Sequence, residues 1–200
     1  MDALTLDPQT QEKADEFIHQ HVTAGFAAAD QIIEWALDYF EDPPDFDALE
    51  AYVVQTTRAA IAAHCAAQRA WLAETDCDRL DFAFLLLEEE HGIVARQNFT
   101  CCQSDGHSEI WGEIRAAQKT RPVSGYIFYH EQDTESVVET GKLYLAFGAV
   151  EQGEAAQLAV AQCSVAVFRE AGFTVEWNGS INQRPCLTGL DWKKRREECC

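Results

Sequence analysis

The hydrophobic pattern of this chain changes at Gly92, and that change restricts the fold more than any other feature of the sequence. Before Gly92, apolar residues recur at helical spacing, as Ile32, Ala36 and Phe40 do. After Gly92, short apolar runs rich in β-branched and aromatic residues alternate with helical patterns. The sequence therefore predicts a helical first half followed by an α+β second half.

The elements that follow from these patterns set the order of the second half. We expect helices over residues 8–24, 27–41, 46–72, 78–91, 107–119 and 153–171, with a helical turn at 134–139. We expect strands over residues 93–99, 123–130, 143–150, 173–177 and 184–190. Without the last strand, the order is that of the ferredoxin-like, or split βαβ, fold. The predicted fold class is α+β, with an N-terminal helical bundle packed on a ferredoxin-like antiparallel sheet domain that carries an extra C-terminal strand.

The predicted elements fall into three regions: an acidic helical region over 1–77, an α+β ferredoxin-like domain over 78–192 and a tail over 193–200. The formal net charge is −19, and residues 1–91 contribute most of it, with 20 Asp and Glu against 4 Lys and Arg. Such a surface repels nucleic acids and anionic lipids and favours basic partners. We therefore expect a basic protein partner, no nucleic acid and no membrane, while the oligomeric state stays open.

The compartment is predicted from the absence of transport signals. The start of the chain shows no secretory signal, and no apolar run approaches the roughly 20 residues that a membrane helix needs. We expect a cytoplasmic protein. Its 8 cysteines are then expected to be mostly reduced thiols. Their scattered spacing, without any CxxC, does not indicate a disulfide framework.

Side chains capable of chemistry gather after the first predicted strand. Cys101 and Cys102 lie between that strand and the next helix, which begins at His107. In the ferredoxin-like order the first two strands are parallel, with the third between them, so the second strand delivers His130 and Asp133 to the same edge, about 10 Å away. A helix N-terminus at this edge lowers thiol pKa values. The catalytic candidates are therefore the two cysteines, His130 and Asp133, with either histidine or Asp133 as base.

Three interpretations of this segment stay open. In the first, Cys101 or Cys102 is a small buried residue, Ser104 or Asp105 caps the helix and Gly106 makes the turn. In the second, one of the two thiols is reactive or senses redox conditions. The third is a metal site. We expect no cofactor, with zinc as the alternative.

The metal site would use Cys101, Cys102, His107 and His130 as ligands. Two arguments weigh against it. Side chains of adjacent residues point apart, and the usual spacing of zinc ligands is absent.

A resemblance to a known family rests on several strings of residues between 71 and 192. Among them are Arg96-Gln97-Asn98-Phe99-Thr100-Cys101-Cys102 and Tyr129-His130-Glu131-Gln132-Asp133. They resemble an uncharacterised bacterial family, a domain of unknown function with no activity attached. In that family a further cysteine often follows the Cys-Cys pair. Here Asp105 occupies its place, which argues against a metal or redox role.

These observations favour a binding protein over an enzyme. The order of elements and the acidity are similar to those of small ferredoxin-like regulators, such as the protein inhibitor of a bacterial RNA-degrading endonuclease. We expect an acidic cytosolic protein that binds and regulates a basic partner, in the manner of an inhibitor or immunity protein. The alternative is a thiol- or metal-dependent site at Cys101, Cys102, His107 and His130.

Overall fold

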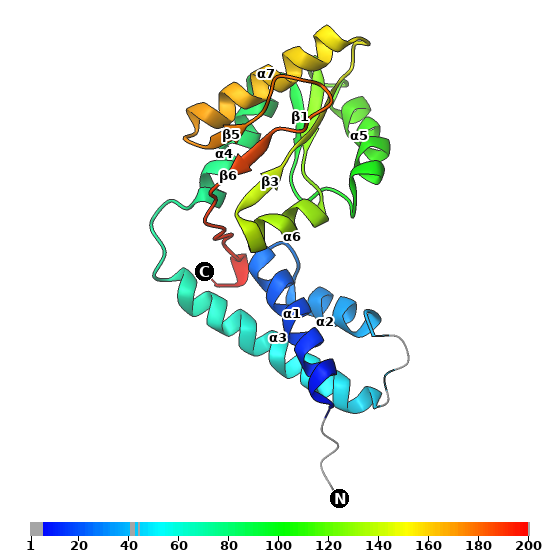
Figure 1. Cartoon of the computed structure of the whole chain (residues 1–200), viewed down its shortest axis with the longest axis vertical. Helices are drawn as coiled ribbons and strands as arrows, with labels where there is room; N and C mark the ends of the chain where they lie inside the picture. Colours follow the sequence, from blue (N-terminus) through cyan, green and yellow to red (C-terminus); the bar gives the residue numbers. More distant parts are fainter. Residues whose placement is uncertain (1–5, 41–42, 44, 200) are drawn as a thin grey trace, which may run out of the picture. The chain divides into compact units, whose positions relative to one another are not determined.

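Seven α-helices and six short strands make up the part of the chain that the computed structural model describes, residues 6–40, 43 and 45–199 (Figure 1). They divide into two compact units. The helical unit comprises Met1–Ala73 together with Lys193–Cys200, and the α+β unit comprises Glu74–Trp192. The α+β class is confirmed. None of the described helices combines the length and the apolar character that crossing a bilayer requires.

The helical unit is built from α1 (Pro8–Ala24), α2 (Ala29–Asp38) and α3 (Phe46–Gln68). The predicted end of the second helix at residue 41 lies outside the described residues. Asp7 caps α1 through its carboxylate, and Pro8 stands at the first helical position, where its missing N–H costs nothing. Apolar residues at helical spacing on all three helices form one buried core: Ala14, Ile18, Val22, Ile32, Ala36, Leu49 and Val53.

The chain returns to the helical unit at its C-terminal end. Arg196 is 3% exposed, and its guanidinium donates to the carbonyls of Val22, at 3.2 Å, and Ala27. A disulfide joins Cys65 of α3 to Cys199, across 134 residues. The spacing of the cysteines did not indicate this pair, because only the folded chain brings the two residues together. In the described chain, five cysteines lie outside this disulfide: Cys77, Cys101, Cys102, Cys163 and Cys186.

The α+β unit contains the remaining elements. Its helices are α4 (Asp76–Glu89), α5 (Gln103–Ala117), α6 (Glu131–Thr140) and α7 (Glu154–Glu170). Its strands are β1 (Ile93–Arg96), β2 (Gly125–Phe128), β3 (Lys142–Tyr144), β4 (Ala146–Ala149), β5 (Thr174–Glu176) and β6 (Cys186–Thr188). One sheet has the order β1-β2-β4 and the other the order β3-β6-β5.

The ferredoxin-like arrangement is not confirmed, and the expectation that a third strand separates the first two is wrong. β1 pairs directly with β2 in parallel, with Arg96 opposite Phe128. The predicted strand 143–150 divides at Leu145, whose N–H donates to the carbonyl of Pro185. Its first part, β3, pairs with β6, and its second part, β4, pairs with β2. The apolar run could not reveal that its two halves belong to different sheets.

Helices cover the sheet β1-β2-β4 on both faces. α5 packs against β1 and β2, and α4 and α7 lie on the other side (Figure 1). The side chains between α5 and the sheet form one core: Val94, Ile110, Ile114, Tyr126, Phe128 and Ala146. The next element after each parallel strand is a helix, so β1 leads into α5 and β2 leads into α6. This connection places two helix starts at the same edge of the sheet.

Candidate functional site

The segments that follow β1 and β2 stay paired beyond the strands. The N–H of Phe99 donates to the carbonyl of Tyr129 at 2.8 Å, and the N–H of Glu131 donates to the carbonyl of Thr100 at 3.1 Å. The ends of the two strands therefore lie at one edge, as the sequence indicates. They are adjacent rather than separated by two strand spacings. α5 and α6 both begin there.

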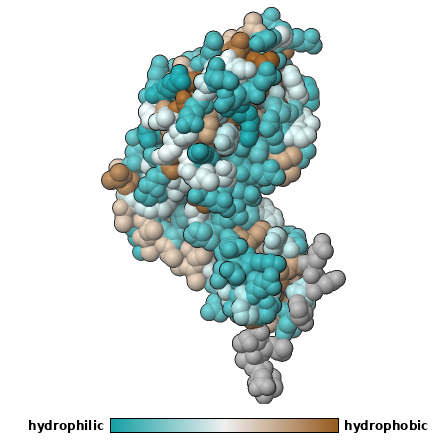
Figure 2. Space-filling model, in the orientation of Figure 1, coloured by the Kyte–Doolittle hydropathy of each residue, from teal (hydrophilic) through white to brown (hydrophobic). Residues whose placement is uncertain are grey.

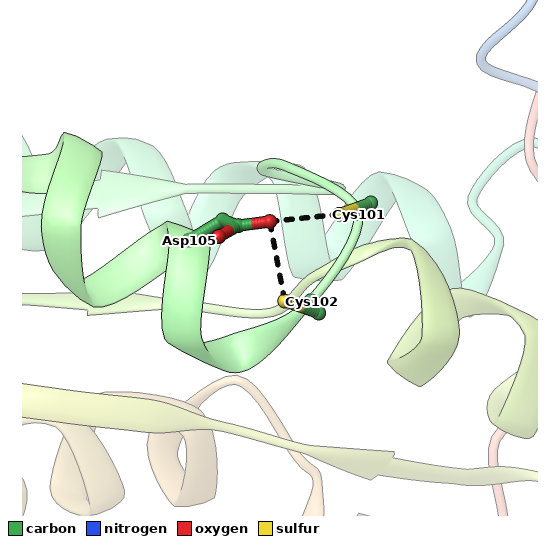
Figure 3. Close-up of side chains that lie close together, drawn as sticks. All are labelled: Cys101, Cys102 and Asp105. Carbon is green, nitrogen blue, oxygen red and sulfur yellow. Dashed lines mark hydrogen bonds between the residues drawn. The ribbon is translucent and has the colours of Figure 1, made fainter.

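At the start of α5, two thiols and one carboxylate converge (Figure 3). Cys101 Sγ lies 3.0 Å from Asp105 Oδ2, and Cys102 Sγ lies 3.3 Å from the same oxygen. Cys101 is exposed and Cys102 is half-buried, so neither is the buried small residue of the first interpretation. Within the described part of the chain, these three residues offer ligand atoms that all lie within 4.8 Å of one another. We call this group the thiol cluster.

The thiol cluster follows an unusual turn of the backbone. Asn98 and Thr100 have φ angles of 49° and 61°, in the left-handed region that residues other than glycine seldom adopt. Cys102 is the N-cap of α5, and Asp105, three residues further on, faces back toward it. The expectation that neighbouring side chains point apart holds for a strand and is wrong for this turn. Neither Ser104 nor Asp105 is the cap, and Cys102 forms no side-chain cap hydrogen bond.

Asp105 sets the protonation of the thiol cluster. Its hydrogen bond with Cys101, followed by that between the two thiols, raises the pKa of Cys101 to about 11. The same two thiol donors lower the pKa of the Asp105 carboxyl. Cys101 is therefore a protonated thiol at neutral pH. A thiolate is the nucleophilic form, so this arrangement opposes the second interpretation, a reactive thiol.

At the start of α6, a histidine and a carboxylate bond each other. His130 is the N-cap of α6, and its Nε2 lies 3.0 Å from Asp133 Oδ2. The N–H of Asp133 donates to Nδ1 of the ring at 3.3 Å, and Arg184 donates to Asp133 Oδ2 at 3.0 Å. His130 and Asp133 are 5% and 3% exposed. Burial lowers the pKa of His130, followed by opposing effects of Asp133 and Arg184, so its ring is neutral at pH 7.

His107 is held separately, on α5. Its Nδ1 lies 2.9 Å from the hydroxyl of Tyr126, and its Nε2 lies 3.3 Å from the side-chain nitrogen of Gln103. Burial lowers the pKa of His107. The structure thus brings Cys101 and Cys102 together and joins neither His107 nor His130 to their cluster.

Two residues that make these contacts, Asp105 and Arg184, were not predicted from the sequence to do so. Asp105 was expected only as a cap, and Arg184 was not considered. The signal for Asp105 was its spacing, because a residue three places after an N-cap faces that cap on the first helical turn. Arg184 carried no such signal, since 51 residues separate it from Asp133.

The chain as a whole matches one known family. The fold and the site define a broad class, that of α+β proteins with free thiols at the start of a helix. Within it, residues 7–196 match the model of a domain of unknown function (DUF6891). The chain belongs to this family, and the match confirms the resemblance and extends it over both units. No curated protein and no solved structure matches the chain.

Proposed function

We propose that the thiol cluster binds a zinc ion through the thiolates of Cys101 and Cys102 and the carboxylate of Asp105. The observation that carries this proposal is the convergence of both sulfur atoms on one carboxylate oxygen. Zinc sites in proteins use thiolate, imidazole and carboxylate ligands at about 2.0–2.3 Å, in tetrahedral geometry. Three protein ligands leave one position for water or a substrate, as in catalytic zinc sites.

The donor types favour zinc over other common cations. Two thiolates are soft ligands, which disfavour magnesium and calcium, and one carboxylate suits a borderline ion such as zinc. The cluster also lies on an exposed turn, so an ion has direct access from solvent. Asp105 supplies the third ligand, and its oxygen makes the set less soft than three thiolates would be.

Asp105 also distinguishes a metal site from a reactive thiol. Asp105 stabilises the protonated form of Cys101 and so reduces the fraction of thiolate, which is the nucleophilic form. A bound metal ion would replace the thiol protons and both hydrogen bonds. The geometry that keeps the thiols protonated in the absence of metal also places their sulfur atoms close enough to bind one ion. Binding then releases protons, and the affinity for zinc is expected to fall as the pH falls.

The test is metal binding by the full-length protein under mild reductant. We expect one equivalent of Zn²⁺ in competition with a chromophoric chelator, and a thiolate-to-metal charge-transfer band with Co²⁺. Cys101→Ser is expected to weaken zinc binding about 100-fold or more. Asp105→Cys is expected to tighten it, because a third thiolate replaces an oxygen ligand.

The matched control is Cys163→Ser, since Cys163 is a free, half-buried thiol on α7 outside the cluster. It is expected to retain the full affinity for zinc. Binding of less than one equivalent by the wild type, or equal losses in Cys101→Ser and Cys163→Ser, contradicts the proposal.

The charge of the helical unit supports a second function, the binding of a basic protein partner. The unit's residues 1–73 and 193–200 carry 15 Asp and Glu against 7 Lys and Arg. The face of the protein drawn in Figure 2 is largely hydrophilic. Electrostatic attraction of this kind weakens with salt. We expect the protein to retain basic partners from a lysate at low salt and to lose them at higher salt. Failure to retain any basic protein at low salt argues against this function.

A further inference from the structure

Four aromatic rings meet on one face of the helical unit. Phe17 and His21 of α1 lie against each other, with ring centroids 4.3 Å apart. Trp35 of α2 lies 5.5 Å from His21, and Tyr39 lies 5.4 Å from Phe17. Trp35 and Tyr39 are 39% and 56% exposed, which is far more than a core role requires. We call these four residues the aromatic patch.

Two exposed carboxylates accompany the exposed rings of the aromatic patch along α2. Glu34 and Asp38 are exposed neighbours of Trp35 and Tyr39 in the sequence, and within the described chain neither forms an ion pair. Tyr39 is the C-cap of α2, and the last turn of that helix contains no basic residue. A helix C-terminus itself attracts cations, so the dipole and the two carboxylates act in the same direction.

The centre of the patch adds no opposing charge. Burial lowers the pKa of His21, so its ring is neutral at pH 7. The indole of Trp35 and the phenol of Tyr39 are therefore available to a cation without repulsion. Tryptophan is the best of the aromatic partners for a cation, and arginine is the cation that most often takes this position.

We propose that the aromatic patch docks an arginine-bearing segment of a basic protein partner. The guanidinium group stacks on Trp35 and Tyr39 and pairs with Glu34 or Asp38. Arginine fits both demands, because its planar group stacks on rings and its N–H groups bond carboxylates. This inference rests on the second proposed function, the binding of a basic partner, and it assigns that function to one surface.

The chain's own basic tail does not fill the patch, because its side chains are placed elsewhere in the helical unit. Lys194 lies over the ring of Phe26 at 5.1 Å, and Arg195 lies over Trp71 at 5.9 Å. Both contacts show that this unit already pairs cations with aromatic rings. The aromatic patch offers the same chemistry to a cation from another chain.

The experiment measures the binding of a fluorescein-labelled nona-arginine peptide to the full-length protein by anisotropy, at low and moderate salt. The double variant Trp35→Ala/Tyr39→Ala is expected to weaken binding about tenfold, because two ring contacts are lost. Both side chains are exposed, so circular dichroism is expected to show an unchanged fold. A nona-lysine peptide is expected to bind more weakly than nona-arginine.

Two controls separate the patch from net charge and from exposed rings in general. Glu34→Gln/Asp38→Asn is expected to weaken binding, whereas Glu89→Gln/Glu90→Gln removes the same charge from exposed positions of the α+β unit and is expected to matter less. Phe82→Ala removes an exposed ring from α4 and is expected to have no effect.

The outcomes distinguish the two levels of the proposal. Equal binding by the wild type and the Trp35→Ala/Tyr39→Ala variant overturns the patch and leaves the binding of basic partners intact. Equal losses in the two charge-removing pairs overturn the patch in the same way, because only net charge then matters. Absence of nona-arginine binding to the wild type at low salt overturns both.

Discussion

The two helices that begin at the edge of the first sheet start with the same layout and different chemistry. α5 has Cys102 as its N-cap, and α6 has His130. Three residues later α5 carries Asp105 and α6 carries Asp133. In α6 the side chains of His130 and Asp133 form a hydrogen bond with each other, and each also accepts from the backbone N–H of the other residue. Both residues are buried. In α5 the carboxylate accepts from two thiols at the surface, and the side chain of the cap accepts no hydrogen bond from a backbone N–H of the helix.

This difference separates a structural helix start from one that is open to a ligand. The first N–H groups of a helix lack partners within the helix, and a capping side chain satisfies them. α6 follows that rule. α5 lacks the capping hydrogen bond, and its first turn brings two thiols and a carboxylate together instead, which is the kind of local departure that functional sites show. The comparison therefore predicts that equivalent substitutions at the two helix starts have different consequences.

The largest expected effect is that of Asp133→Ala. Removal of this buried carboxylate leaves Arg184 and His130 without their common partner and leaves the N–H of His130 unbonded. We expect the free energy of unfolding to fall by about 3 kcal/mol, allowing for the partial exposure of Arg184. Urea denaturation measures this loss.

Asp105→Ala is the matched control, because Asp105 occupies the same position in α5. We expect the free energy of unfolding to change by less than about 1 kcal/mol, since this side chain lies at the surface. Similar losses in both variants would remove the distinction between the two helix starts.

Gly106→Ala tests whether α5 is held at a fixed position over the sheet. A Cβ at Gly106 would overlap the ring of Phe128, which is fully buried. The overlap outweighs the better helix propensity of alanine, and we expect a loss of about 1–2 kcal/mol by thermal or urea unfolding. Gly112 lies on the same helix, and a Cβ there would meet no neighbouring side chain or other element within 4 Å. Gly112→Ala is expected to stabilise the protein by up to about 1 kcal/mol. Equal effects at the two glycines would show that the contact with Phe128 does not fix α5.

The predictability of this edge from sequence depends on how local each feature is. The two strands followed from apolar runs, and their parallel direction was expected only from the ferredoxin-like order. The helices after them were expected to begin at 107 and 134, whereas they begin at Gln103 and Glu131. The split of the run around Leu145 between two sheets did not follow from the sequence, because each part is paired by a different distant strand. The disulfide between Cys65 and Cys199 was likewise hidden by distance along the chain. The thiol cluster was predicted in part: the two cysteines were candidates from the sequence, but their shared acceptor Asp105 was interpreted as a cap.

The next prediction concerns the pH dependence of Cys101 alkylation. With Asp105 present, the pKa of Cys101 is about 11, so the alkylation rate is expected to rise steeply above pH 9. Asp105→Asn removes the carboxylate that holds the thiol proton, and the midpoint is expected to move down toward the ordinary value of 9.0. At pH 8 the thiolate fraction then rises about tenfold or more. Mass spectrometry of the peptide containing Cys101 measures the rate, and an unchanged pH profile in the variant would show that Asp105 does not set this pKa.

The smallest expected effect, and the sharpest for the comparison, is that of Cys102→Ser. Serine is a preferred N-cap, and its hydroxyl can accept from the N–H of Asp105, which Cys102 does not do. We expect the free energy of unfolding to rise by about 0.5–1 kcal/mol while the affinity for zinc falls. A gain in stability with a loss of binding marks a residue kept for its ligand atom, since function and stability often conflict at such sites. A loss of stability in urea denaturation would instead make Cys102 a structural residue, and the start of α5 would then resemble that of α6.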